Sequence, residues 1–127
     1  MSHPEPADYS RPNATTIAAQ NDAFRNSILG NPSVADAPQG QFVMTCGVAA
    51  LGPDAQLELT RRVAAFDAFN ADSDPQGLHE MGVIEFNGTK VWFKIDLYDV
   101  DYQYGSPEPS DPKQTRRVLT LLLPSEY

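Results

Sequence analysis

The sequence has a single cysteine, few basic residues and no long hydrophobic run. Cys46 is the only cysteine among 127 residues, so no disulfide forms within the chain, and a reducing cytoplasm is the expected location. Nine Lys and Arg accompany 17 Asp and Glu, for a net charge of -8. This balance argues against direct binding to nucleic acid or to anionic membranes, because both need clustered bases. No run approaches the roughly 18 apolar residues that cross a bilayer, and the N-terminal residues have no apolar core of a signal peptide.

What the sequence does contain is enough apolar character for one folded domain. At 41% hydrophobic residues, the chain can bury a core, and its length suits a single domain. Residues 1–13 combine prolines with polar groups and lack periodicity, so we predict a disordered tail there. Residues 14–127 form the predicted domain.

Periodicity and turn residues predict two helices and four strands. Asn13 is the expected N-cap of the first helix, and Gly30 with Pro32 ends it. Asn87-Gly88 suits a type I′ hairpin turn, which needs two residues with positive φ. The predicted elements are a helix over 14–29, a strand over 41–48, a helix from Pro53, and strands over 80–86, 89–98 and 115–123. We expect an α+β fold: a two-layer sandwich of order α-β-α-β-β-β, with a four-stranded, mostly antiparallel sheet and two helices on one face.

The strand over 89–98 should present two different faces, because side chains alternate along a strand. The set expected to face the helices is Val91, Phe93, Ile95 and Leu97. The set expected on the open face of the sheet is Trp92, Lys94, Asp96 and Tyr98. This second set is suited to recognition. The simpler interpretation is a solvated face on which Trp92 covers a neighbouring strand and Lys94 pairs with a cross-strand acid.

Acidic residues concentrate in two segments. Residues 63–89 and residues 95–112 each contain five acids and no Lys or Arg. If the segments lie together, they form a negative surface for a basic partner or a divalent cation; a solubilising surface is the alternative. The candidate binding residues are Trp92, Lys94, Asp96, Tyr98, Asp99, Asp101, Tyr102, Tyr104, Asp72 and Asp74.

Motifs for a metal or a catalytic centre are incomplete. The loop from Asp72 begins like a calcium loop, but its twelfth position is Val83 where a bidentate Glu is required, so a turn with Asx-type hydrogen bonds is expected instead. His79, beside Glu80, is the only histidine of the predicted domain and the one candidate general base. Cys46 lies in an apolar run, which predicts a buried, inert thiol. We predict no metal and no cofactor.

Five further polar residues are candidates for specific hydrogen bonds or ion pairs. Asn21 interrupts the apolar stripe of the first helix, so its amide should bridge the helix to a loop or mark a site. Asp22 and Arg25, three residues apart, should pair locally. One of Arg116 and Arg117 should reach the open face, where a salt bridge to Asp96 or recognition of an anion is expected.

Several segments together resemble a family of small bacterial proteins of unknown function, found mainly in alphaproteobacteria and often on plasmids or integrated elements. The similarity spans residues 21–127, and the family pattern lacks the N-terminal tail and the stretch 31–40. It implies a single α+β domain with an accessory role in mobile-element biology, and no cofactor or catalytic residue. The segments are Asn21-Asp22-Ala23-Phe24-Arg25, Thr45-Cys46-Gly47-Val48-Ala49, Asp74-Pro75-Gln76-Gly77-Leu78-His79-Glu80-Met81-Gly82, Phe93-Lys94-Ile95-Asp96-Leu97-Tyr98-Asp99 and Pro124-Ser125-Glu126-Tyr127.

These observations support three hypotheses. The first is a non-catalytic acidic binding or inhibitor protein, a mobile-element accessory that acts on a basic, nucleic-acid-handling protein, such as an anti-defence or anti-CRISPR protein. The alternative is a small enzyme or ligand-binding domain, with a carboxylate-metal hydrolase as the chemistry and His79, Glu80, Lys94 and Asp96 as its residues. The third is a homodimer built through the sheet edge or the Trp92 face.

Overall fold

The computed structural model describes residues 11–29 and 38–127. The predicted tail and the loop over 30–40 therefore lie mostly outside the described residues. In chain order the elements are α1 (Arg11–Ser27), β1 (Gly40–Met44), α2 (Cys46–Ala49), α3 (Pro53–Ala65), β2 (Met81–Phe86), β3 (Thr89–Tyr98), β4 (Arg116–Leu122) and the short 3-10 helix η2 (Pro124–Glu126).

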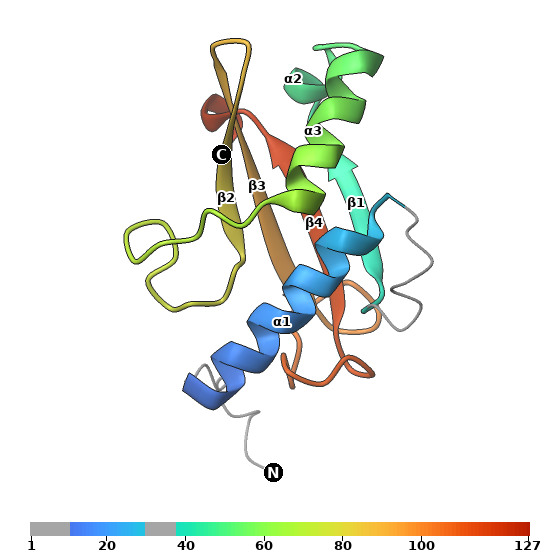
Figure 1. Cartoon of the computed structure of the whole chain (residues 1–127). Helices are drawn as coiled ribbons and strands as arrows, with labels where there is room; N and C mark the ends of the chain where they lie inside the picture. The colour runs from blue at the N-terminus through green and yellow to red at the C-terminus, as the bar shows by residue number, and fades with distance from the viewer. Residues whose placement is uncertain (1–10, 30–37) are drawn as a thin grey trace.

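The four strands form one mixed sheet in the order β1-β4-β3-β2 (Figure 1). Strands β2, β3 and β4 pair antiparallel, whereas β1 pairs parallel to β4. The α+β class and the four-stranded sheet are confirmed, but the expectation of a mostly antiparallel sheet is wrong because of β1. A parallel pair needs a long crossover connection. Here α2, α3, β2 and β3 all intervene between the two paired strands, so no local pattern reveals their pairing.

The β2–β3 hairpin forms where the sequence predicts it. Asn87 has φ 49° and Gly88 has φ 81°, the left-handed conformation that both central positions of a type I′ turn require. Phe86 and Thr89 face each other across the turn. The turn therefore sets the register of the whole antiparallel pair.

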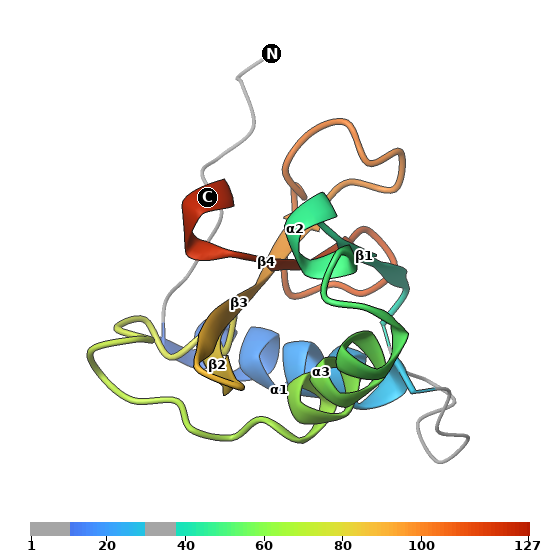
Figure 2. The same ribbon diagram turned by 90° about the horizontal axis from the view of Figure 1, so that it is seen from above.

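Helices α1 and α3 lie side by side on the same face of the sheet (Figure 2). Strand β3 presents its predicted apolar set to them, and Val91, Phe93 and Ile95 of that set are buried. The main core joins α1, α2, α3 and the sheet, and it contains Phe24, Val48, Leu59, Val63, Ile84, Val91, Phe93, Ile95, Leu119 and Leu121.

Two predicted boundaries are wrong. Helix α1 begins at Arg11, so Asn13 lies inside the helix and does not cap it. Strand β1 ends at Met44, and the chain then turns into α2, which leaves Cys46 exposed. The turn is tied to the C-terminal end of the chain, because the amide of Gly47 donates to Oε2 of Glu126 at 3.0 Å. This contact joins residues far apart in the sequence, so the local apolar pattern did not indicate the turn.

Candidate functional site

The open face of the sheet is the side opposite α1 and α3 (Figure 2). The predicted set from β3 is half-buried there, as expected for side chains on an uncovered sheet surface. The strand register places residues of β2 and β4 beside it. We define the open face by Met81, Val83, Glu85, Lys90, Trp92, Lys94, Asp96, Tyr98, Arg116, Val118 and Thr120. Of the two paired arginines of β4, Arg116 is therefore the one on this face.

An ion pair lies at the centre of this face. The Nζ of Lys94 donates to Oδ2 of Asp96 at 2.8 Å, and this hydrogen bond is the main reason that the pKa of Lys94 is raised, against the opposing effect of burial. The predicted arginine bridge to Asp96 is absent among the described ion pairs. Lys94 and Asp96 are two positions apart on one strand, so their side chains share a face and pair directly.

The two acidic segments meet beside this ion pair. Glu80 and Asp96 line a shallow hollow of about 300 Å³, together with Ile95, Leu97, Tyr98 and Gly105. The pKa of the Glu80 carboxyl is raised, first by burial and then by the negative charges of Asp74 and Asp96. The ionised Glu80 is therefore disfavoured by its surroundings, and a cation brought next to it would relieve this cost. We refer to this feature as the Glu80–Asp96 hollow.

The loop after β3 is a folded turn held by its own acid. Asp99 Oδ1 accepts hydrogen bonds from the amides of Asp101 and Gln103 at 3.2 and 3.0 Å, and the amide of Asp99 donates to the carbonyl of Tyr104 at 2.8 Å. Tyr102 adopts a positive φ of 59° within it. The turn leaves Asp101 exposed and the ring of Tyr104 73% exposed. It thus presents an aromatic and an acidic group to solvent.

The loop from Asp72 is held by hydrogen bonds from its own backbone amides to nearby side chains. Asn70 Oδ1 accepts the amides of Asp72 and Ser73 at 2.9 and 3.0 Å, which confirms the expected Asx-type turn. Asp74 is buried, and its carboxylate accepts the amides of Leu78 and His79 at 2.9 and 3.1 Å. Of the two acids of this loop that were predicted to bind a partner, Asp72 and Asp74, only Asp72 is exposed.

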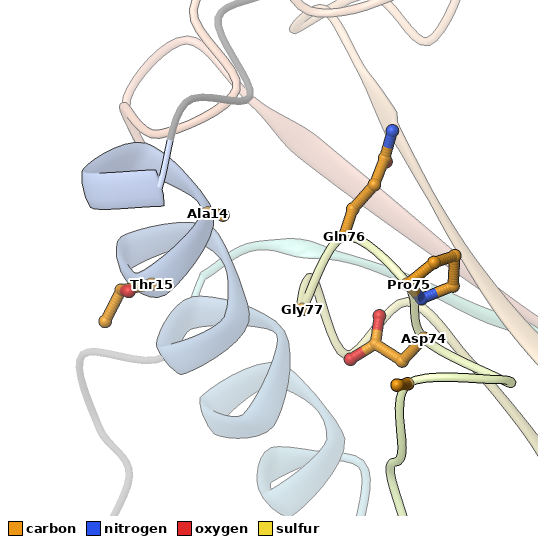
Figure 3. A pocket seen from close by; sticks show the side chains of 7 residues that line it. Ala14, Thr15, Asp74, Pro75, Gln76 and Gly77 are labelled. Carbon is orange, nitrogen blue, oxygen red and sulfur yellow. The ribbon is translucent and has the colours of Figure 1, made fainter.

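A larger hollow, of about 490 Å³, separates this loop from the start of α1. Figure 3 shows Asp74 and Gly77 on the loop and Ala14 and Thr15 on the helix. The lining offers a single charged side chain, and that carboxylate is already engaged by two backbone amides. Among the described residues, no group of three or more His, Cys, Asp or Glu is arranged to hold a metal ion.

The predicted catalytic residues are divided between two places. His79 Nδ1 lies 2.9 Å from Oδ1 of Asp22 on α1, and its ring stacks on Phe69 at a centroid distance of 4.1 Å. This histidine therefore packs against the helical layer. Glu80 and Asp96 lie together at the Glu80–Asp96 hollow. The contacts of the His79 side chain within the described residues do not include either of them.

Buried polar residues under α1 form a network that the sequence revealed only in part. Asn21 Nδ2 donates to the carbonyl of Leu78 at 2.8 Å, which confirms the bridge from helix to loop. Arg117 Nε donates to Oδ1 of Asn21 at 2.7 Å, and its second terminal nitrogen, Nη2, donates to Oε1 of Gln20 at 3.1 Å. Asp22 and Arg25 pair locally, as predicted. In the sequence, the one indication that Arg117 is buried is its place on the same apolar face of β4 as Leu119.

A comparison with protein families gives one match. Residues 44–126 match a family described as a protein of unknown function, DUF3768. The chain belongs to this family. No curated protein and no solved structure matches it.

The part of the chain shared with DUF3768 runs from the end of β1 to η2 and contains β2, β3 and β4. It therefore includes the open face and the Glu80–Asp96 hollow, whereas α1, which carries Asn21 and Asp22, lies outside it. The family assignment supports an uncharacterised α+β domain. Within the described residues, no helix is long and apolar enough to cross a membrane.

Proposed function

We propose that this protein is a non-catalytic acidic binding protein that engages a basic protein partner through the open face of its sheet. The observation that carries this proposal is the Glu80–Asp96 hollow, where the two base-free acidic segments come together. The pKa of Glu80 is raised first by burial and then by the charges of Asp74 and Asp96. A lysine or arginine of a partner placed there would offset the repulsion from these two charges. Binding would therefore relieve an unfavourable interaction of the Glu80 carboxylate that is already present in the free protein.

Aromatic groups near the hollow support the same function. Tyr98 lines it, and Trp92 lies on the same face with its ring centroid 5.5 Å from that of the exposed Tyr127. Tyrosine and tryptophan supply much of the binding energy at protein interfaces, and arginine of a partner stacks well on their rings. Carboxylates beside aromatic rings therefore suit a surface rich in arginine.

Nucleic-acid-handling proteins present such basic surfaces, because they neutralise phosphates with Lys and Arg. We therefore propose the specific role of a bacterial mobile-element accessory that acts in the cytoplasm and inhibits a host or competitor protein of this class, as an anti-defence or anti-CRISPR protein would. The net charge of -8 supports fast, salt-sensitive association with such a partner.

A binding assay with matched variants tests the proposal. The immobilised protein is exposed to the heparin-binding fraction of a bacterial lysate at about 0.1 M and about 1 M salt, which give Debye lengths of about 10 and 3 Å. We expect proteins that are retained at low salt and released at high salt. The double variant Glu80→Gln/Asp96→Asn should lose them. A control with Asp67→Asn and Asp54→Asn removes the same charge from exposed acids of the helical layer and should retain them.

Equal retention by both double variants would show that total charge, and not the open face, attracts the basic proteins, and the proposal would fail. Retention of nothing at low salt would also refute it. A small enzyme centred on His79 is less well supported, because His79 contacts Asp22 and Phe69 in the helical layer, away from Lys94 and Asp96.

A further inference from the structure

Strand β2 forms one edge of the sheet, and its backbone alternates between bonded and outward-facing residues. The amide of Ile95 donates to the carbonyl of Glu80 at 2.8 Å. Because antiparallel residues alternate between hydrogen-bonded and non-bonded pairs, the register assigns Gly82, Ile84 and Phe86 to bonds with β3. The N–H and C=O groups of Met81, Val83 and Glu85 therefore point away from the sheet.

Only one of these outward groups has a partner within the described part of the chain. The carbonyl of Glu85 accepts a hydrogen bond from Nη1 of Arg62 at 2.8 Å. For the backbone of Met81 and Val83, the described residues supply no such bond along this edge. Exposed strand edges of this kind are templates for another strand unless they are covered or carry protective charges.

The side chains at this edge are selective for a partner. Met81, Val83 and Glu85 all lie on the open face, opposite Lys94, Trp92 and Lys90 in the register, and Val83 is 44% exposed. Carboxylates stand at both ends of this apolar centre: Glu80 just before β2 and Glu85 near its end. Glu80 and Glu85 are five positions apart, so alternation places them on opposite faces. An incoming strand would meet Val83 and Glu85 on the open face, where Lys90 lies opposite Glu85, and Glu80 on the other face.

We propose that an extended segment of the basic partner adds to β2 as a fifth strand, with its apolar residues against Val83 and its Lys or Arg residues at Glu80 and Glu85. The proposal rests on the proposed function and adds the mode of recognition. Main-chain hydrogen bonds would supply affinity, and the alternate side chains would supply specificity. A second copy of this chain is a poorer occupant, because two chains that each carry a net charge of -8 repel each other at low salt.

A defined peptide tests this mode on the intact protein. The probe is a synthetic ten-residue threonine-rich peptide with one valine, a lysine two residues before it and a lysine three residues after it, added to the ¹⁵N-labelled protein at low salt. In antiparallel pairing its valine would meet Val83 and its lysines would meet Glu85 and Glu80. We expect hydrogen exchange of the Met81 and Val83 amides to slow about tenfold or more, as outward N–H groups become bonded. The same peptide with N-methyl groups on its bonding residues should bind about tenfold more weakly or not at all.

A variant of the protein tests the main-chain hydrogen bond between Val83 and the peptide. Val83→Pro removes one outward N–H and no ladder bond, so the sheet should persist while peptide affinity falls about tenfold. Val83→Ala shortens the side chain but keeps the N–H, and its edge amides should still be protected by the peptide. If Val83→Pro unfolds, the N-methylated peptide provides the test with the unaltered protein.

The outcomes separate this inference from the proposed function. Peptide binding that shifts the Glu80 and Asp96 signals without protecting the edge amides would overturn strand addition and leave the acidic binding face in place. No binding by the peptide at low salt would count against both. Protection of Met81 and Val83 amides in the free protein that grows with its own concentration would assign the edge to a second copy and overturn the inference.

Discussion

The strongest prediction concerns the buried pair of Asn21 and Arg117. Both side chains are fully buried, and Nη1 of Arg117 has no hydrogen-bond partner among residues 11–29 and 38–127. Burial lowers the pKa of Arg117 to about 10. At 1.36 kcal/mol for each pKa unit below the ordinary arginine value, charging this guanidinium in the folded protein costs roughly 3 kcal/mol. Its hydrogen bonds to Asn21 and Gln20 offset part of that cost.

Replacing either partner should therefore have very different effects. Asn21→Leu leaves the carbonyl of Leu78 without its donor and leaves the buried cation with one fewer acceptor, so we expect a loss of about 3 to 5 kcal/mol in the free energy of unfolding. Arg117→Met removes the buried charge but leaves Oδ1 of Asn21 without its donor. The two effects oppose each other, so this variant should stay within about 1 kcal/mol of the unaltered protein. The double variant should lose only about 1 to 2 kcal/mol, since the unpaired carbonyl is then the main defect.

Urea unfolding of the four proteins measures this cycle, provided that their m-values agree. We expect a coupling of about 2 to 3 kcal/mol between Asn21 and Arg117. Strictly additive losses would refute it. A loss above about 4 kcal/mol for Arg117→Met alone would also refute it, because the cation would then be stabilised by its surroundings.

Three further predictions follow from single positions. Gly82→Ala should destabilise the protein by about 1 to 3 kcal/mol, because its Cβ would lie 2.3 Å from a phenylalanine ring atom. Gly88→Ala has open space around it and should cost only the strain of positive φ, about 1 to 2 kcal/mol. Urea unfolding that ranks the two losses in the reverse order would contradict this. The pKa of Glu126 is lowered chiefly by the hydrogen bond from a threonine hydroxyl. The stabilisation from this carboxylate is therefore present above the ordinary glutamate pKa and is lost as pH falls through the pKa of the folded protein. Glu126→Gln should unfold more easily at pH 7 and lose less stability on acidification, and an unchanged pH dependence would refute the assignment. Cys46 is exposed, so a thiol-specific disulfide reagent should label one thiol per chain without denaturant, and a need for denaturant would restore the buried thiol that the apolar run suggested.

Local patterns in the sequence were sufficient to predict features that depend on residues within a single element or turn. Asn87-Gly88 predicted the hairpin because both residues tolerate positive φ, and the alternation in β3 identified the buried and open faces. Asn21 was recognised as a bridging residue because a polar group in an apolar stripe must find partners on burial. Each inference needed only neighbours within a few positions.

The candidate site was predicted in part for the same reason. The open-face residues of β3 followed from alternation, but the meeting of the two acidic segments at Glu80 and Asp96 depends on the pairing of β2 with β3 and on the fold of the following loop. The attachment of His79 to Asp22 joins residues 57 positions apart. The burial of Asp74 likewise depends on how its own loop closes on the amides of Leu78 and His79.

By itself, the sequence determined the α+β class, the hairpin and which side of β3 is apolar, because turn conformation and alternation are properties of short stretches of chain. Tertiary structure alone decided that β1 runs parallel to β4, that Cys46 is exposed, and that Arg117 is buried beneath α1. These outcomes depend on contacts between distant segments. Such contacts form only where burial of the shared core repays the entropy of bringing those segments together.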